Sequence, residues 1–499
     1  MARDMFDIER LPPSLDTFLR EANPWWQARP GRVLPPYRRW AFHVLKRKLE
    51  TGLSPVVVVR GPRQVGKTTL QEQLIEQYVT EGQVDPARIL RVQFDEIPSL
   101  RRLPEPVLSI CRWFEARILK RTFNEAARAG QPALVFLDEV QNLRDWAPQV
   151  KALVDHHSVR AVVTGSSSLR IEAGRDSLAG RITTVDLGTL LLREIAGLRF
   201  AEQFEPLLKG NGLKPLADPE FWREQVRHGR RLADVRDRAF EAFSDRGGYP
   251  IAQANPDVPW EELADQLNET VIQRAIQHDL RMGSRGIKRD QGLLEEVFRL
   301  SCRYAGQAPG QAVFVQEAKQ ALGANIGWRR ILNYLKFLDG ALLIKLIAPL
   351  EMRLKRRRGN YKICLCDHGL RASWLQEKIP LTVEGLRSHP QLSDLAGHLA
   401  ESIVGYSLAG LPHLDVGHFP ERGIEPEVDF VLTVGEQRVP VEVKYRQRID
   451  RRRDTLGLKA FIEKTVYKAS FGLLVTMHDV EVDDPRIIPI CLPSLLLLR

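Results

Sequence analysis

The sequence has few cysteines and no long apolar run, and these absences limit the kinds of protein it can be. Its five cysteines are an odd number without a paired CxxC spacing, so we expect reduced thiols and no zinc site. No stretch approaches the roughly 20 apolar residues of a membrane-spanning helix. Residues 1–20 mix charged and apolar side chains, unlike a signal peptide. We therefore expect a soluble, cytoplasmic protein without a membrane partner.

The remaining composition is typical of a globular chain. Its 499 residues leave room for two to four domains, and a hydrophobic content of 43% is enough for ordinary cores. Lys and Arg number 73 against 63 Asp and Glu. This surplus is compatible with a polyanionic partner, although many soluble proteins carry one without it.

The stretch PVVVVRGPRQVGKTTL, from Pro55 to Leu70, combines the parts of a phosphate site. Four β-branched valines predict a buried strand, a glycine loop follows, and the apolar spacing after the loop predicts a helix. Backbone N–H groups of such a loop surround a polyphosphate at the helix N-terminus. A glycine turn in an unrelated α/β domain is the alternative. The residues expected to bind ATP here are Gly61, Pro62, Arg63, Gln64, Val65, Gly66, Lys67, Thr68 and Thr69.

An acidic pair later in the chain supplies the other half of this site. Residues 133–137 are typical of a fully buried strand, and Asp138 and Glu139 stand at its carboxyl end, where ligands bind in open α/β sheets. We expect Lys67 to reach the β- and γ-phosphates. Thr68 and Asp138 would hold Mg²⁺, and Glu139 would act as the base that polarises the attacking water.

Two further positions could act on the γ-phosphate. The next predicted strand, 161–164, ends in Thr164 and is followed by Ser166, and either hydroxyl could sense the phosphate; a simple turn is the alternative. Arg181 follows in SLAGRI and could enter a neighbouring subunit's site to stabilise transition-state charge. That role would require a homo-oligomer. A surface arginine that pairs locally is the alternative.

Residues 310–346 predict a helix-turn-helix followed by a strand that could begin a wing. A groove-reading role is plausible for the second helix, but a packing module with solvated basic residues is the alternative. The basic loop Arg353 to Lys362 could contact phosphates or be a solvated turn. The exposed face of the second helix would carry Trp328, Arg329, Arg330, Asn333 and Lys336, and its buried face Ile331, Leu332, Leu335 and Leu338.

The last hundred residues contain a second group of candidate catalytic residues. Glu401 lies among apolar residues of a predicted helix, and Asp429 lies on the first of two predicted strands. Period-2 alternation puts Glu442 and Lys444 on one face of the second strand, where Asp429 can meet them. Glu401, Asp429 and Glu442 could hold a metal ion for phosphodiester hydrolysis, with Lys444 beside it. An ordinary β-hairpin is the alternative, and Pro440 predicts an edge or bulged strand.

These motifs resemble two known families. GPRQVGKTT, VFLDEVQ, TGSSS and LAGR, in this order, resemble the prokaryotic AAA-type ATPases that carry an uncharacterised C-terminal domain. The resemblance continues in GGYP, VIQRAIQHDL and DHGL, and it implies Mg²⁺-dependent ATP binding and hydrolysis. The pattern of Glu401, Asp429 and Glu442-x-Lys444 resembles the restriction-endonuclease-like nuclease superfamily.

We therefore expect a multidomain α/β ATPase with a P-loop parallel sheet, using ATP and Mg²⁺, with DNA as a partner. An ATP-driven DNA-processing enzyme, a DNA-binding motor without cleavage, and an ATP-dependent switch or scaffold with an inactive nuclease-like domain remain open. The expected domains are an N-terminal arm (1–36), an AAA-type core (37–199), a helical lid (200–295), a winged-helix-like module (296–350) and a nuclease-like domain (351–499).

Overall fold

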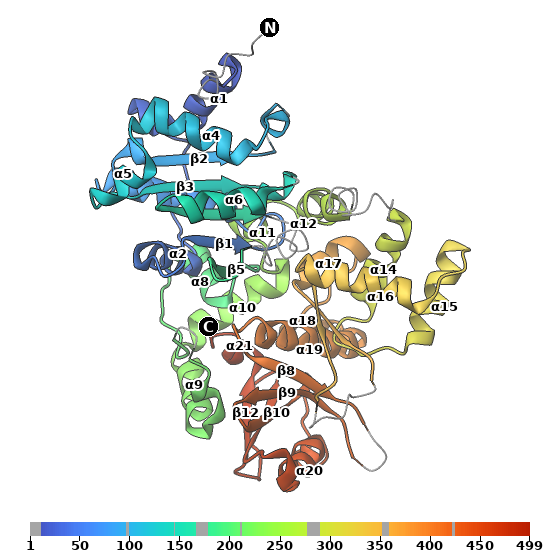
Figure 1. Cartoon of the computed structure of the whole chain (residues 1–499). Coiled ribbons are helices and arrows are strands. Elements are labelled where there is room, and N and C mark those ends of the chain that lie inside the picture. Colours follow the sequence, from blue (N-terminus) through green and yellow to red (C-terminus); the bar gives the residue numbers. More distant parts are fainter. Residues whose placement is uncertain are drawn as a thin grey trace. The chain divides into compact units, whose positions relative to one another are not determined.

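The computed structural model describes residues 11–95, 99–143, 145–165, 178–209, 212–276, 290–351, 359–421 and 425–499. The chain divides into two compact units, Met1–Leu187 and Gly188–Arg499 (Figure 1). All five cysteines are free and buried. Among the helices of the described ranges, none is long and apolar enough to cross a membrane.

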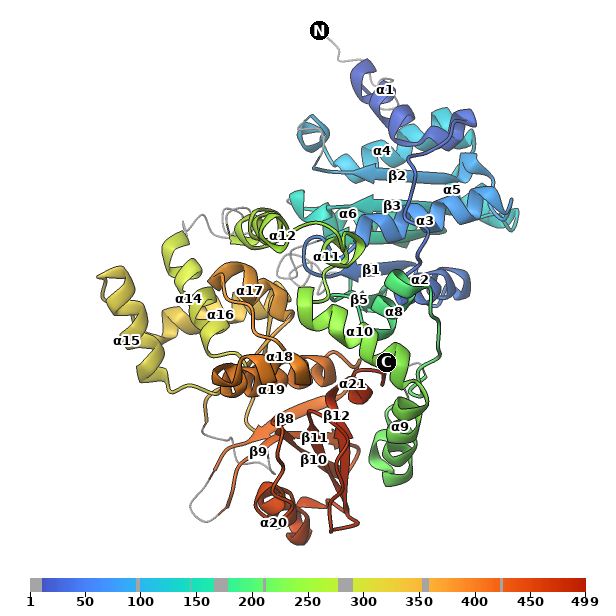
Figure 2. The same cartoon turned by 180° about the vertical axis from the view of Figure 1, so that it is seen from behind.

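The first unit is built on a five-stranded, fully parallel sheet with the order β2-β3-β4-β1-β5. Helix α6 covers one face of this sheet and α3 the other, as the opposite views in Figures 1 and 2 show. The strands are β1 (Val56–Arg60), β2 (Ile89–Gln93), β3 (Ala133–Asp138), β4 (Val159–Gly165) and β5 (Ile182–Asp186). The helices are α1 (Pro13–Ala22), α2 (Trp40–Thr51), α3 (Lys67–Thr80), α4 (Pro106–Phe114), α5 (Phe123–Arg128) and α6 (Trp146–His156).

The apolar β-branched runs form the central strands, as the sequence predicts. All four valines of β1 are fully buried because β4 and β5 flank this strand and helices cover both faces. Helices α4 and α5 do not form one continuous helix. A π-helical turn (Glu115–Leu119) follows α4, and α5 begins anew at a capping box in which Thr122 and Glu125 bond each other's backbone N–H groups.

The N-terminal segment protects the edge strand β2. The Asn23 amide donates to the Arg91 carbonyl (2.9 Å) and accepts from the Arg91 N–H (2.7 Å), so it completes the free edge as a further strand would. The indole N–H groups of Trp25 and Trp26 both donate to the Ile89 carbonyl, at 3.1 and 2.8 Å. This segment therefore packs on the edge of the sheet.

The second unit holds two sheets and most of the helices. Its strands are β6 (Ile344–Ile347), β7 (Lys362–Leu365), β8 (Asp415–Phe419), β9 (Val428–Val434), β10 (Gln437–Lys444), β11 (Gly472–Thr476) and β12 (Ile487–Cys491). Its helices are α8 (Leu192–Phe200), α9 (Pro219–Arg231), α10 (Ala233–Arg246), α11 (Pro250–Ala254), α12 (Trp260–Leu267), α14 (Gln291–Arg303), α15 (Gln311–Leu322), α16 (Trp328–Gly340), α17 (His368–Leu375), α18 (Val383–Ser388), α19 (Ser393–Ala409), α20 (Leu456–Glu463) and α21 (Leu492–Leu495).

The larger sheet of this unit is mixed and has the order β12-β11-β10-β9-β8. Strands β8, β9 and β10 are antiparallel neighbours, whereas β10, β11 and β12 are parallel. Strand β10 is therefore interior over most of its length. At Pro440, where the sequence predicts an edge or a bulge, it has a ladder partner on β9 alone. Pro440 pairs with Val431 of β9, and the ladder with β11 starts one residue later, at Val441.

Helices α14, α15 and α16 precede the small antiparallel sheet of β6 and β7. The predicted second helix is present as α16, and Ile331, Leu335 and Leu338 on it are buried while Leu332 is half-buried. On its opposite face Arg329, Arg330, Asn333 and Lys336 are exposed. Trp328 is half-buried because its ring contacts Phe314.

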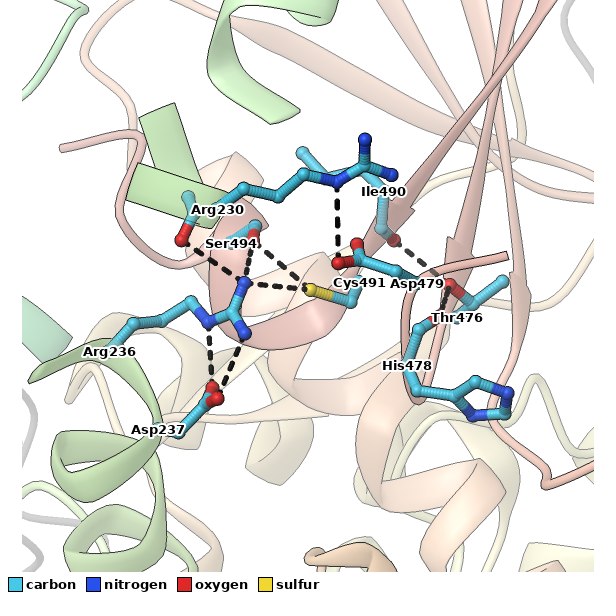
Figure 3. A network of polar contacts seen from close by, with 10 residues as sticks. Arg230, Arg236, Asp237, Thr476, His478, Asp479, Ile490, Cys491 and Ser494 are labelled. Carbon is cyan, nitrogen blue, oxygen red and sulfur yellow. Dashed lines mark hydrogen bonds and ion pairs between the residues drawn. The ribbon is translucent and has the colours of Figure 1, made fainter. Parts of the chain in front are cut away.

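A buried polar network joins α9 and α10 to the end of the chain (Figure 3). The Arg236 guanidinium donates to Ser494 Oγ at 2.8 Å and to the Gly229 carbonyl at 3.2 Å, and it lies 3.6 Å from Cys491 Sγ. Gly229 permits this packing, because a Cβ there would lie 2.1 Å from Ser494 Oγ. The segment predicted as a lid is thus anchored to β12 and α21 within the second unit.

Candidate functional site

The loop between β1 and α3 has the backbone geometry of a phosphate-binding loop. Gly61 approaches the Leu187 carbonyl so closely that a Cβ would lie 2.1 Å from that oxygen. Gly66 has a φ of +90°, which residues with side chains rarely adopt, and it precedes the first residue of α3. The N-terminus of α3 therefore opens directly into the loop.

Lys67 lies within this loop rather than on the surface. Only 5% of the residue is exposed, and its ammonium donates to the carbonyls of Gly61 (3.1 Å) and Pro62 (2.7 Å). A lysine held there presents its charge where the loop would hold a phosphate. A further cation supports the loop from outside it: the buried Arg39 donates to the Val65 carbonyl at 2.7 Å. Arg39 was missed because no motif contains it.

Asp138 is fully buried at the end of β3 and is the centre of the polar contacts. Its Oδ2 accepts from Thr68 Oγ1 at 2.7 Å, and its Oδ1 accepts from the hydroxyl of Thr164. The guanidinium of Arg91, on β2, lies 3.7 Å from Oδ2. Burial and repulsion from Glu139 raise the pKa of Asp138 despite these bonds. The pair of oxygens from Thr68 and Asp138 fits Mg²⁺, whose positive charge would favour the ionised carboxylate.

Glu139 begins the turn after β3 in a left-handed conformation, with a φ of 53°. Non-glycine residues adopt this region rarely, and it is enriched at functional sites. The turn is fixed by Asn142, which donates to the Glu139 carbonyl at 3.0 Å, and the Gln141 amide donates to the Glu139 carboxylate. Glu139, the predicted base, therefore directly follows Asp138, the predicted metal ligand, on a turn that side-chain hydrogen bonds stabilise.

The remaining predicted ATP-site residues have different outcomes. Thr164 contacts Asp138, so its hydroxyl joins the site at the end of β4. Ser166 lies outside the described residues. Arg181 pairs with Asp155 of the same chain, with a second bond of 3.0 Å between Nη2 and Oδ2, which is the local pairing that we weighed as the alternative.

A second cluster of charged side chains lies in the C-terminal part of the second unit. Glu401 on α19 and Asp429 on β9 both contact Lys362, at 2.9 and 2.7 Å, and Asp429 also accepts from the Val443 N–H at 2.8 Å. The predicted position of Lys362 in a phosphate-contacting basic loop is wrong. Lys362 is the first residue of β7, and its side chain is 2% exposed.

The other members of this cluster are Glu442 and Lys444 on β10, whose side chains are 2.5 Å apart. Burial, together with repulsion from Asp429, raises the pKa of both Glu401 and Glu442 to about 8. Burial alone would lower the pKa of Lys362, but attraction to Asp429 and Glu401 raises it.

The structure brings the four predicted residues close together, but not as the metal site that the sequence predicts. Because the ammonium of Lys362 lies between Glu401 and Asp429, the predicted metal set of Glu401, Asp429 and Glu442 does not fit a metal ion. Across the part of the chain that the structure describes, no group of three or more His, Cys, Asp or Glu residues could hold one. Lys362 was missed because a run of basic residues is typical of a solvated loop.

Two motifs that carried only a family resemblance also meet in space. The Gly248 N–H of GGYP donates to Asp367 Oδ2 of DHGL at 2.5 Å, and Asp367 Oδ1 caps α17 through the Gly369 N–H at 2.7 Å. A Cβ on Gly247 would lie 2.1 Å from Asp367 Oδ1. The paired glycines of GGYP therefore make room for a buried carboxylate.

Comparison with known proteins agrees with the geometry of the first unit. Residues 53–196 match the family described as an AAA domain. This match and the parallel five-stranded sheet support a nucleotide-binding P-loop ATPase of the prokaryotic AAA type.

The similar proteins found by sequence are uncharacterized. The chain is 24% identical to Rv2008c of Mycobacterium tuberculosis and to Mb2031c of Mycobacterium bovis over 341 residues, 67% of this chain and 58% of theirs. It is 24% identical to MJ1637 of Methanocaldococcus jannaschii over 336 residues, 65% of this chain and 64% of that protein. The matched region thus spans less than two thirds of each relative.

Proposed function

We propose that this chain binds ATP with Mg²⁺ and hydrolyses it at the loop between β1 and α3. The observation that carries the proposal is the 2.7 Å contact between Thr68 Oγ1 and Asp138 Oδ2, at the point where the loop, α3 and β3 converge. This contact brings together two oxygens of the kind that Mg²⁺ prefers, one of them on the residue that follows the buried Lys67.

Each side chain has a role that follows from its position. The loop N–H groups and Lys67 bind the phosphates, Thr68 and Asp138 hold the metal, and Glu139 accepts a proton from the attacking water. Mg²⁺, when bound with ATP, neutralises charge on the phosphate oxygens. The contacts of Thr164 and Arg91 orient Asp138 and favour its ionised form against the effect of burial.

Separating binding from hydrolysis tests these roles. Glu139→Gln should retain binding of a fluorescent ATP analogue but lose hydrolysis by at least about 10²-fold, because the base is lost while the phosphate ligands remain. Lys67→Ala should weaken binding as well. Wild-type hydrolysis by Glu139→Gln would contradict the role of Glu139, whereas binding unaffected by Lys67→Ala would contradict the site itself.

We also propose that nucleic acid is the partner to which ATP hydrolysis is coupled. The support is the face of α16 on which Arg329, Arg330 and Lys336 are exposed. Helix α16 follows α15 and a turn, and it precedes the β6–β7 sheet, which is the order of elements in a winged helix. A homo-oligomer in which Arg181 acts on a neighbour's phosphates remains part of the proposal, and there Arg181 would have to exchange its contact with Asp155.

The alternative is an ATP-dependent switch or scaffold whose nuclease-like domain is inactive. The convergence of Glu401, on α19, with Asp429, Glu442 and Lys444 of the mixed sheet supports the restriction-endonuclease-like fold. The position of Lys362 disfavours metal-dependent cleavage. ATPase activity that is indifferent to DNA and RNA would favour the switch. Stimulation by either would favour the coupled ATPase.

A further inference from the structure

The ammonium of Lys362 lies between the carboxylates that would bind the metal ion in a metal-dependent site. Its ammonium contacts Glu401 Oε2 at 2.9 Å and Asp429 Oδ1 at 2.7 Å, and it lies 4.9 Å from the centre of the Phe430 ring. The side chain is 2% exposed. A buried ammonium between two carboxylates neutralises them as a metal ion would, and removing it would leave buried charge uncompensated.

The backbone of strand β7 is hydrogen-bonded along both of its edges. The Leu365 N–H donates to Ser402 Oγ on α19 at 2.8 Å. The Ile363 N–H donates to the Gln307 carbonyl at 2.9 Å, and the Ile363 carbonyl accepts from the Gly306 N–H at 2.7 Å. The other edge of β7 pairs with β6 along its whole length. The backbone of Lys362 is therefore held in place, and its side chain is buried within the cluster.

We propose that Lys362 is the resident cation of the Glu401, Asp429 and Glu442 cluster, so that this domain takes up no divalent metal there and does not cleave phosphodiester bonds. Instead, the lysine joins β7, which follows the helix-turn-helix segment, to α19 and β9 of the mixed sheet. This inference does not depend on ATP hydrolysis by the first unit.

The cluster retains the chemistry of a latent metal site. Glu442 is 8% exposed and pairs through Oε1 with Lys444, while its Oε2 is buried without a hydrogen-bond partner among the described residues. Without Lys362, the three carboxylates of the cluster and the nearby Glu427 would be left with the single ammonium of Lys444. Such a set of hard oxygen ligands is of the kind that Mn²⁺ or Mg²⁺ prefers.

Binding of Mn²⁺ to the full-length, nucleotide-free protein tests the proposal. Wild type and Glu442→Gln should give the same Mn²⁺ isotherm, because any ion held at Thr68 and Asp138 contributes equally to both. Lys362→Ala should unfold roughly 5–10 °C below wild type and gain one Mn²⁺ site at least about tenfold tighter than any in wild type. Adding Glu442→Gln should remove the gained site.

A matched control is Lys345→Ala, on the paired strand β6, where the lysine is half-buried and lies opposite Cys364. It should change neither the Mn²⁺ isotherm nor the unfolding temperature by a comparable amount. A wild-type Mn²⁺ site that disappears in Glu442→Gln would overturn the proposal, and so would a folded Lys362→Ala protein that gains no site. If Lys362→Ala does not fold, comparison of the wild-type and Glu442→Gln isotherms still shows whether wild type binds Mn²⁺ at the cluster.

Discussion

Asp138 shows how one residue can oppose stability and serve function. It is fully buried, and its two hydroxyl contacts and the nearby Arg91 do not offset the burial and the repulsion from Glu139 that raise its pKa. A buried carboxylate of this kind is costly until a cation arrives. Metal binding therefore explains the position of Asp138 beside Thr68 better than a contribution to stability does.

Asp138→Asn should accordingly separate the two properties. Hydrolysis should fall by about 10²-fold or more because a metal ligand is lost, whereas the unfolding temperature should stay the same or rise because a buried charge is removed. Phosphate release titrated with Mg²⁺, together with a thermal melt in metal-free buffer, measures both. Near-normal hydrolysis with a lowered unfolding temperature would mean that Asp138 is structural.

Asp367 predicts a pH dependence of stability. Burial raises its pKa from 3.8 to about 7, so between these values the folded state holds a proton that the unfolded state has lost. Its contribution to stability is full below about pH 4 and is lost as the pH rises to 7. The neighbouring His368, whose pKa burial lowers to about 4, contributes the opposite slope up to its ordinary pKa of 6.5.

Comparing wild type with Asp367→Asn isolates the carboxyl because His368 is present in both. Between pH 5 and 6.5, the unfolding free energy of wild type should fall relative to that of the variant by about 1.4 kcal/mol per pH unit. Urea unfolding at several pH values gives the two curves. Parallel curves would show that Asp367 does not titrate in this range.

At the scale of elements, helix α19 offers a matched pair of glycines. A Cβ on Gly405 would lie 2.4 Å from Cys364 Sγ of β7 and 2.7 Å from the Phe430 ring of β9, whereas Gly397 on the same helix has nothing within 4 Å. Gly405→Ala should destabilise the second unit by about 1–3 kcal/mol through overpacking. Gly397→Ala should stabilise it by about 0.5–1 kcal/mol because alanine favours the helix.

Denaturant unfolding of the two variants and wild type measures both effects. Opposite signs would support the close packing of β7 and β9 against α19, on which the position of Lys362 depends. Equal effects of the two substitutions would argue against that packing.

The exposed face of α16 predicts a contact with phosphates. Replacing Arg329 and Lys336 by alanine should weaken DNA binding and lower the salt dependence of log K by roughly 1–2, because each phosphate contact contributes about 0.9. Arg227→Ala with Arg231→Ala, two exposed arginines of α9, is the control for loss of charge alone. DNA affinity measured at several salt concentrations distinguishes the two double variants. Equal losses of affinity in both would mean that net charge, and not the face of α16, is responsible.

The elements predictable from sequence are those whose signal is local. The valines of β1 and the apolar run of β3 predicted their strands, and the residues of the phosphate loop followed from spacing alone. Lys362 could not be found in this way, because its role depends on carboxylates 39 and 67 positions away in the sequence. Arg39 and the contact between GGYP and DHGL depend on tertiary packing in the same way.

At the scale of the whole molecule, the two units carry different kinds of site. The first contains a loop whose Gly66 adopts a φ of +90°, a buried lysine and a buried carboxylate, which are the parts of the nucleotide hydrolase that we propose. The second contains a basic helix face and a charge cluster neutralised by its own lysine. We therefore expect ATP hydrolysis by the first unit, and nucleic-acid recognition without phosphodiester cleavage by the second.

Steady-state ATP hydrolysis is the most direct test of the proposed function. Wild type and Lys67→Ala would be compared with and without Mg²⁺, and with and without single- and double-stranded DNA, at low and moderate salt. We predict Mg²⁺-dependent phosphate release that DNA stimulates, more at low salt, and that Lys67→Ala abolishes. Hydrolysis that persists in Lys67→Ala, or a wild-type protein that releases no phosphate under any of these conditions, would contradict the assignment.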